Sequence, residues 1–342
     1  MRLGVQRLVR RRLGRAGLVL GLGLVLVLSA WAPGAGAKTS ACLVINGAAD
    51  TSYKSLQAGV NDAQAAATLW IRGTCTGTTE IAKDLTLTGQ QPRGFTAPTL
   101  DGGSQGSVLT IDTGVAVTIN TLTITGGSGT NLEGANVGGG IFNSGGAVVL
   151  NDTNITGNNG GHGGGIASGQ GSVTLNDSSI SGNTAGLENG GVFNVDGSVT
   201  LNGSSSISDN NVGGGVPGDG GGIGSNGGTV TLNDSSSISG NTAVTEGGGV
   251  SVIAAASVTL NDSSSISGNT AGTLGGGIYN VGNSSVTLND SSSITGNTAG
   301  ADGGGIYNDV FAGPVTLNDS SSITGNTPNN CAPPGSVVGC TG

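Results

Sequence analysis

Basic residues are nearly absent from this chain of 342 residues. Its 11 Lys and Arg stand against 20 Asp and Glu, and no Lys or Arg follows Arg93. Nucleic acid is not expected as a partner, because neutralising phosphates needs clustered Lys and Arg. An acidic chain also repels acidic polysaccharides.

Helical patterns and aromatic side chains are also scarce. The chain holds 70 glycines, 3% aromatic residues and one histidine, His162. Glycine-rich, Ser-rich and β-branched segments form helices poorly. Outside the N-terminal segment, only residues 51–67 have helical composition, and we expect a short helix there that caps the N-terminal end of the fold. Because the chain has one histidine, any Ser/His/Asp catalytic triad would have to contain His162.

What the chain has in abundance is one phrase, clearest at residues 275–299 as GGGIYNVGNSSVTLNDSSSITGNTA. Val286, Thr287 and Leu288 alternate apolar and polar side chains, which is the period of a half-buried strand. The segments around Ile278 and Ile294 behave alike, giving about three short strands per unit. Units stacked about 4.8 Å apart would bury these residues in a continuous core. The repeat leucines are 25 to 31 residues apart, at Leu150, Leu175, Leu201, Leu232, Leu260, Leu288 and Leu317.

The phrase organises the chain into a single solenoid of roughly ten coils with distinct ends. Residues 1–37 read as a secretory signal, with a basic start, an apolar run and a small-residue cleavage site. Residues 38–137 would form an N-terminal cap and irregular early coils, residues 138–327 the repeat coils, and residues 328–342 a C-terminal disulfide cap. Removal of the signal leaves five basic against 20 acidic residues, a net charge of −15.

Four cysteines lie outside the repeats, two near each end of the mature chain. An even number in an exported protein indicates disulfides. The economical pairing joins Cys42 to Cys75 and Cys331 to Cys340, whereas a tetrahedral metal site is the alternative. We expect Pro328, Pro333 and Pro334 to stop strand propagation at the C-terminal end.

The repeat resembles that of polymorphic outer membrane proteins within the right-handed parallel β-helix (pectate-lyase-like) superfamily. The resemblance rests on GGGIFN at residues 138–143, GGVFN at 190–194 and GGGIYN at 275–280 and 303–308, each followed by a VTL-like strand and an S-I-S/T-G-N segment. It implies an all-β, single-stranded, right-handed parallel β-helix. It does not imply one activity, because the superfamily hosts lyases, hydrolases, adhesins and passive stalks.

The enzymatic expectations of that superfamily fit this chain poorly. The resemblance implies, for polysaccharide lyases of the superfamily, an Arg or Lys that abstracts a proton from an acidic sugar, together with carboxylate-bound Ca²⁺. The repeat region has no Lys or Arg to act as this base. Its polygalacturonase-like hydrolases carry four motifs, of which only the sequence around His162, Gly161-His162-Gly163, has a counterpart here. We interpret His162 as a solvated loop residue, and a hydrolase or lyase remains the alternative.

Two polar positions recur once per coil. One Asn in the S-I-S/T-G-N turn should form a stacked amide ladder with a structural role. One Asp after VTLN should stack at about 5 Å and repel its neighbours, so these side chains either turn into solvent or are bridged by Ca²⁺. The asparagines are Asn158, Asn183, Asn210, Asn241, Asn269, Asn297 and Asn326. The strongest calcium candidates are Asp234, Asp262, Asp290 and Asp319.

Departures from the repeat are the places where function is expected. The position after the Ile or Val of GGGI should point outward, and it is aromatic at several copies. Phe193, Tyr279 and Tyr307 are therefore candidate ligand-binding residues, with the two tyrosines as neighbours on adjacent coils. A second candidate is the insertion at residues 211–220 in the longest repeat.

These observations favour a secreted, non-catalytic surface or adhesin-like protein, extracellular or at the cell surface. We expect it to be a monomer that has no membrane-spanning segment after signal removal and binds an extracellular glycan or a cell-envelope protein. The alternative is an extracellular polysaccharide-active enzyme of the superfamily. Ice binding by outward Ser and Thr fits less well, because mixed side chains and unequal coil lengths disturb a regular lattice.

Overall fold

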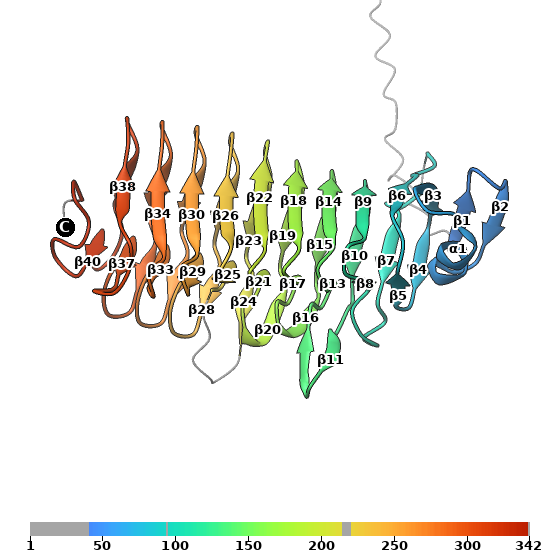
Figure 1. Ribbon diagram of the computed structural model, residues 1–342, viewed down its shortest axis with the longest axis horizontal. Coiled ribbons are helices and arrows are strands. Elements are labelled where there is room, and N and C mark those ends of the chain that lie inside the picture. Colours follow the sequence, from blue (N-terminus) through green and yellow to red (C-terminus); the bar gives the residue numbers. More distant parts are fainter. Residues whose placement is uncertain (1–40, 94, 214–219, 341–342) are drawn as a thin grey trace, which may run out of the picture. The chain divides into compact units, whose positions relative to one another are not determined.

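The computed structural model describes residues 41–93, 95–213 and 220–340, and these form a right-handed parallel β-solenoid of about nine turns (Figure 1). The predicted fold class is confirmed. The expected signal at residues 1–37 lies outside the described residues, as do residues 214–219 of the insertion.

Four stacked sheets run along the solenoid, and we name them after the repeat letters that form them. The VTL sheet contains, in order, β2 (Thr51–Tyr53), β1 (Leu43–Asn46), β3 (Ala67–Arg72), β6 (Leu85–Gly89), β9 (Ala116–Asn120), β14 (Ala147–Asn151), β18 (Ser172–Asn176), β22 (Ser198–Asn202), β26 (Thr229–Leu232), β30 (Ser257–Leu260), β34 (Ser285–Leu288) and β38 (Val315–Leu317). The SIS sheet contains β4 (Thr74–Thr76), β7 (Thr99–Asp101), β10 (Thr123–Thr125), β15 (Asn154–Thr156), β19 (Ser179–Ser181), β23 (Ser206–Ser208), β27 (Ser237–Ser239), β31 (Ser265–Ser267), β35 (Ser293–Thr295) and β39 (Ser322–Thr324).

The other two sheets meet at the GGG segments. The TA sheet contains β11 (Thr130–Leu132), β12 (Ala135–Val137), β16 (Asn159–His162), β20 (Thr184–Glu188), β24 (Asn211–Val212), β28 (Thr242–Ala243), β32 (Thr270–Ala271) and β36 (Thr298–Ala299). The IYN sheet contains β5 (Thr79–Ile81), β8 (Leu109–Ile111), β13 (Ile141–Asn143), β17 (Ile166–Gly169), β21 (Val192–Val195), β25 (Ile223–Asn226), β29 (Val250–Ile253), β33 (Ile278–Asn280), β37 (Ile306–Asn308) and β40 (Cys331–Ala332). The expectation of about three strands per coil missed the short TA strands.

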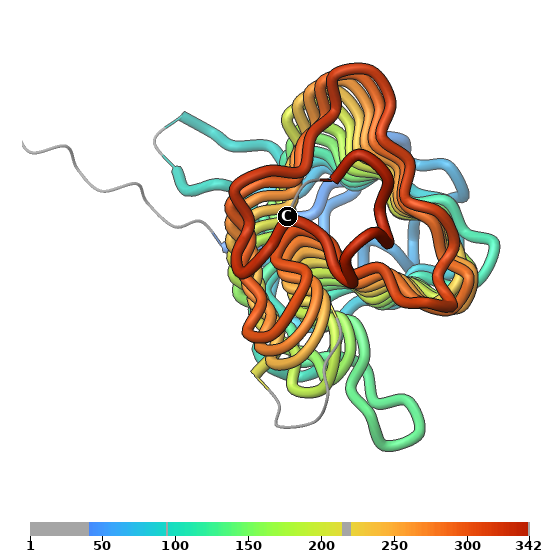
Figure 2. The backbone as a smooth tube through the Cα atoms, turned by 90° about the vertical axis from the view of Figure 1, so that its left-hand side faces the viewer, coloured from blue at the N-terminus to red at the C-terminus, as the bar shows by residue number. Residues whose placement is uncertain are grey.

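Coil-to-coil register is maintained despite unequal repeat lengths. Leu232 pairs with Leu201 on one side and Leu260 on the other, although one step is 31 residues and the next 28. All three leucines are fully buried, as are the stacked Val and Ile residues of the same coils. The core columns of the described coils therefore stay aligned along the solenoid, whose stacked turns Figure 2 shows end-on.

The GGG segments bring the TA and IYN strands too close together for side chains. A Cβ at Gly276 would lie 2.5 Å from the carbonyl oxygens of Thr298 and Gly304. A Cβ at Gly277 would lie 2.5 Å from the Gly305 carbonyl oxygen. Glycine recurs here because each coil turns tightly against the backbone of the next.

Two asparagine ladders tie the coils together. The predicted ladder is confirmed: its members are at most 8% exposed, and each Nδ2 donates to the Oδ1 of the asparagine in the next coil at 2.9–3.0 Å. A second, half-buried ladder, at the Asn of VTLN, was not expected. Its Nδ2 groups donate toward the preceding coil at 2.7–2.9 Å, as from Asn233 to Asn202.

The N-terminal end is closed by antiparallel pairing and one helix. Strand β1 pairs antiparallel with β3 and with β2, and Cys42 is bonded to Cys75 as predicted. The helix, α1 (Leu56–Asp62), is shorter than the expected 51–67, because residues 51–53 pair with β1 instead. Ser55 caps it by accepting the Ala58 N–H. A hydrogen bond with Asp62 raises the pKa of Tyr53 in β2 above its ordinary value.

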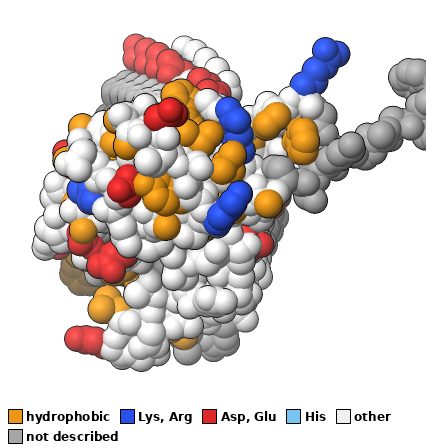
Figure 3. Space-filling model, turned by 90° about the vertical axis from the view of Figure 1, so that its right-hand side faces the viewer, with side chains coloured by type: hydrophobic (Ala, Val, Ile, Leu, Met, Phe, Trp, Pro, Cys, Tyr) orange, Lys and Arg blue, Asp and Glu red, His pale blue; other side chains and the backbone are white. Residues whose placement is uncertain are grey.

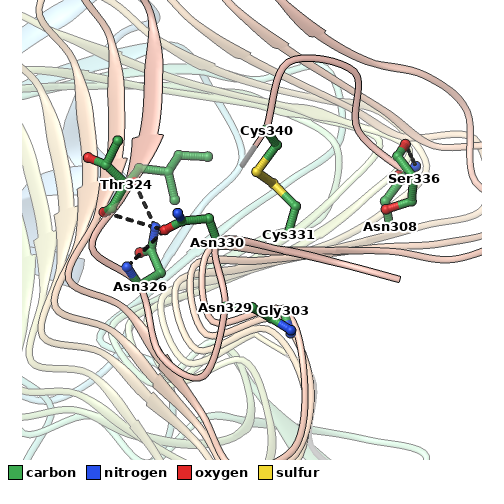
Figure 4. The surroundings of a disulfide bond; sticks show 10 residues. Gly303, Asn308, Thr324, Asn326, Asn329, Asn330, Cys331, Ser336 and Cys340 are labelled. Carbon is green, nitrogen blue, oxygen red and sulfur yellow. Dashed lines mark hydrogen bonds between the residues drawn. A yellow bond between two sulfur atoms is a disulfide. The ribbon is translucent and has the colours of Figure 1, made fainter. Parts of the chain in front are cut away.

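The C-terminal end is closed by a partial coil (Figure 4). Asn330 ends the buried ladder by accepting from the backbone N–H and Nδ2 of Asn326 at 3.0 and 3.1 Å. Cys331 is bonded to Cys340, as predicted. Pro328 does not stop the strands as expected: β40 pairs with β37 beyond it, and the sheet ends at Pro333.

Charge is distributed unevenly along the solenoid. All Lys and Arg of the described residues lie between Lys54 and Arg93, and Lys and Arg side chains are visible at the N-terminal end (Figure 3). Arg72 donates to the Gln90 side chain and Lys83 to the Ala63 carbonyl, so these cations use neutral acceptors. The repeat coils therefore present an acidic surface with no Lys or Arg of their own.

Candidate functional site on the IYN sheet

Aromatic side chains gather on the outer surface of the IYN sheet. Phe142, Phe193, Tyr279 and Tyr307 occupy the same position of β13, β21, β33 and β37, and each is half-buried. The inward residues of these strands are fully buried, as Ile278 and Ile306 show. The predicted alternation, with Ile inward and the aromatic residue outward, is therefore correct.

Tyr279 and Tyr307 are neighbours, as the sequence predicted. They pair in the parallel register of β33 and β37, and their rings stack with centroids 5.7 Å apart and planes inclined by 22°. A stacked, half-exposed pair presents aromatic surface at the side of the solenoid. Its role in binding a ligand stays a prediction.

A hairpin turns the other end of the aromatic surface into a groove. Strands β11 and β12 pair antiparallel and project from the solenoid (Figures 1 and 2). Leu132 and Val137 of this hairpin line a groove of about 360 Å³ together with Phe142, Ala167 and Phe193. We name this the hairpin groove. Leu132 is 51% exposed, which is unusual for a large apolar side chain in this protein.

His162 lies beside the hairpin groove in a position that the sequence did not predict. It is not a solvated loop residue: it ends β16, is half-buried, and has its ring centroid 5.5 Å from that of Phe193. Its Nδ1 lies 3.2 Å from Oε2 of Glu188. Within the described ranges, no other His, Lys or Arg nitrogen lies within 4.0 Å of a carboxylate oxygen.

A column of residues that precede the GGG segments explains why these groups meet. Val137 pairs with His162, and His162 pairs with Glu188, so consecutive coils place the three side by side. The close turn at each GGG then brings this column beside the outward residues of the IYN sheet. The repeat alignment contains this signal, because the position before the glycine segment varies from copy to copy, whereas the segment itself is GGG in every copy except Asn189-Gly190-Gly191.

The aspartate column has a structural explanation in its backbone. Asp234, Asp262, Asp290 and Asp319 are exposed and adopt φ of 54° to 58°, a left-handed conformation that Asp tolerates in turns. Oδ2 of Asp262 accepts the Asp234 N–H at 3.0 Å, and Oδ2 of Asp290 accepts the Asp262 N–H at 3.2 Å. Among residues 41–93, 95–213 and 220–340, no three His, Cys, Asp or Glu side chains come together as around one metal ion. The calcium hypothesis stays a prediction.

The second sequence candidate, residues 211–220, is described only at its ends. Asn211 and Val212 form β24, which pairs with β20, and Gly220 precedes β25. Residues 214–219 lie outside the described residues and carry no argument.

Comparisons with protein-family models, with curated proteins and with solved structures found no match to this chain. In the part of the chain that the structure describes, no helix is long and apolar enough to cross a membrane.

Proposed function

We propose that this protein is a secreted, non-catalytic surface or adhesin-like interaction protein that binds an extracellular glycan or another cell-envelope component. The stacked pair of Tyr279 and Tyr307 on the outer IYN surface carries this proposal. Aromatic faces that stay half-exposed in an otherwise polar solenoid suit the apolar faces of sugar rings or a partner's side chains.

The other repeated residues have structural roles, which leaves the aromatic residues as the candidates for binding. The asparagines at the repeated ladder position form hydrogen bonds with one another, and the GGG segments allow close approach of the backbones of adjacent coils. Two disulfides suit an oxidising compartment, which is consistent with export. We also propose that the solenoid belongs with the pectate-lyase-like β-helices bearing polymorphic outer membrane protein repeats, and that it acts as a monomer.

A glycan array tests the binding function directly. The mature protein and the Tyr279→Ala/Tyr307→Ala variant are applied to the same array of neutral and charged glycans. We expect wild-type binding and at least a tenfold loss in the variant. A protein that binds nothing on the array or to envelope extracts would contradict the proposal, and Thr287→Ala on the outer VTL surface serves as the surface control.

A polysaccharide-active enzyme is the second candidate, and the contact between His162 and Glu188 favours it. A histidine oriented by a carboxylate, beside an apolar groove, can serve as a general acid or base. The nearest ring is Phe193, which would hold a sugar next to the pair.

Product analysis separates the enzyme from the binding protein. Incubation with a panel of extracellular polysaccharides, with and without Ca²⁺, is followed by assays for new reducing ends and unsaturated products. The binding proposal predicts neither product. Products that disappear in His162→Ala but persist in Tyr279→Ala would establish the enzyme instead.

A further inference from the structure

The hairpin groove differs from the rest of the solenoid in shape and in charge. Its base is Ala167, only 3% exposed, and Phe142 and Phe193 lie on the coils to either side. With coils about 4.8 Å apart, the two rings are roughly 10 Å apart along the solenoid. Leu132 and Val137 of the hairpin form one wall.

The groove can recognise a ligand only through side chains. Strands β13, β17 and β21 are interior strands, each paired with a neighbour on both sides. Their backbone groups are therefore used, and an extended peptide cannot add as a further strand on this surface. Two spaced aromatic rings suit a chain of rings with apolar C–H faces, which is a property of oligosaccharides.

Polar side chains lie where such a ligand would carry hydroxyl groups. Ser144 and Gln170 line the groove and are exposed. Their hydroxyl and amide groups both donate and accept hydrogen bonds. They can therefore serve hydroxyls without imposing a charge.

Two carboxylates, Glu133 and Glu188, belong to the elements that flank the groove. Glu133 follows Leu132 at the hairpin turn, and Glu188 is held by His162, whose ring lies against Phe193. No Lys or Arg follows Arg93, so none offsets the acidic charge of these coils. A polyuronate would be repelled, whereas an ammonium group would be attracted and could bond to a carboxylate.

We propose that the hairpin groove binds a cationic amino-sugar oligosaccharide. Its ring faces lie on Phe142 and Phe193, and its ammonium groups pair with Glu188 and Glu133. His162 acts as a positioning residue that orients the Glu188 carboxylate. This assignment rests on the proposed binding function and names the ligand chemistry of one part of the IYN surface.

Calorimetry with three oligosaccharides of equal length tests the charge selection. Chitosan, chitin and galacturonate oligosaccharides offer ammonium, acetamide and carboxylate groups on similar rings. At low salt we expect chitosan oligosaccharides to bind at least tenfold more tightly than chitin oligosaccharides, and galacturonates not to bind. The preference should shrink as salt rises, because screening weakens exposed ion pairs.

Variants locate the site. Glu188→Gln should weaken chitosan oligosaccharide binding about tenfold and leave chitin oligosaccharide binding unchanged, because only the charge is lost. Phe193→Ala should weaken both about tenfold. Glu246→Gln is the matched control: Glu246 precedes a GGG segment at the position that Glu188 takes before Asn189-Gly190-Gly191, lies outside the groove, and should change neither by more than twofold. Melting curves confirm that each variant is folded.

Other outcomes overturn the assignment in distinguishable ways. Equal binding of chitosan and chitin oligosaccharides, or no effect of Glu188→Gln, would refute it. An oligolysine peptide of equal charge that binds as tightly as the chitosan oligosaccharide would show recognition of charge alone. Loss of the groove's binding with intact, Tyr279-dependent glycan binding would leave the proposed function standing, whereas no binding at either place would reject both.

Discussion

At the scale of single residues, the two asparagine ladders should contribute differently to stability. Asn241, fully buried, donates through Nδ2 to the Ile207 carbonyl and to Asn269, and its Oδ1 accepts two N–H groups of Asn210. Asn233, half-buried, makes one bond to Asn202 and receives one from Asn261. Water can replace the bonds of Asn233 but not those of Asn241.

We therefore expect Asn241→Ala to cost about 2–4 kcal/mol of unfolding free energy, because it leaves buried donors and acceptors without partners. Asn233→Ala should cost less than about 1 kcal/mol. Urea unfolding of both variants measures the difference. Equal losses would show that position within the coil, rather than burial, decides the value of a ladder residue.

At the scale of the coil, glycine has two separate reasons to recur. Gly268 has φ of 63° and open space around its missing side chain. Gly276 has an ordinary φ, but a Cβ would meet backbone oxygens at 2.5 Å. Conformational strain applies at the first position and steric overlap at the second.

We expect Gly276→Ala to cost about 3 kcal/mol or more, since the overlapping atoms belong to the backbone of the next coil. Gly268→Ala should cost only about 1–2 kcal/mol for the left-handed conformation. Gly268→Asp should cost less again, because Asp209 already occupies the equivalent position with φ of 55°. Denaturant midpoints rank the three variants, and a mild Gly276→Ala would refute the packing explanation of GGG.

The aspartate column allows a test of calcium at the same scale. Its carboxylates already accept backbone N–H groups of the preceding coil, as Asp262 does from Asp234. If cations only screen repulsion between these side chains, CaCl₂ and MgCl₂ at equal ionic strength should raise Tm equally over EDTA. A larger effect of Ca²⁺ that disappears in Asp262→Asn would instead establish a calcium site.

The strands that the sequence predicted are those whose side chains alternate. Val286-Thr287-Leu288 shows a period of two, and so does the segment around Ile278, and both are strands. The TA strands are two residues long, as at Thr298–Ala299, and only pairing with the next coil defines them. The outward position of Phe193 could be predicted because it follows from alternation within its own strand. Its neighbours His162 and Leu132 could not, because they come from other strands that the GGG turn and the hairpin bring near.

At the scale of the whole solenoid, each coil contacts only the coils next to it. The stability of a coil should therefore depend on its own contacts and on those with its two neighbours. The two disulfides then protect the ends rather than the middle. They enclose sequence separations of 33 for Cys42–Cys75 and 9 for Cys331–Cys340. Loop-closure entropy assigns roughly 3.5 kcal/mol to the first and roughly 2.5 kcal/mol to the second.

Replacing Cys331 and Cys340 together by serine should therefore destabilise the C-terminal coils by about 2.5 kcal/mol and leave the central coils unchanged. Hydrogen exchange followed by mass spectrometry measures this. We expect faster exchange than in the wild type in β37 and β40, and an unchanged exchange rate in β26 and β30. The matching Cys42→Ser/Cys75→Ser variant should affect β1 and β3 by a larger amount. Faster exchange along the entire chain in either variant would mean that the solenoid unfolds as one cooperative unit, and that each cap stabilises every coil.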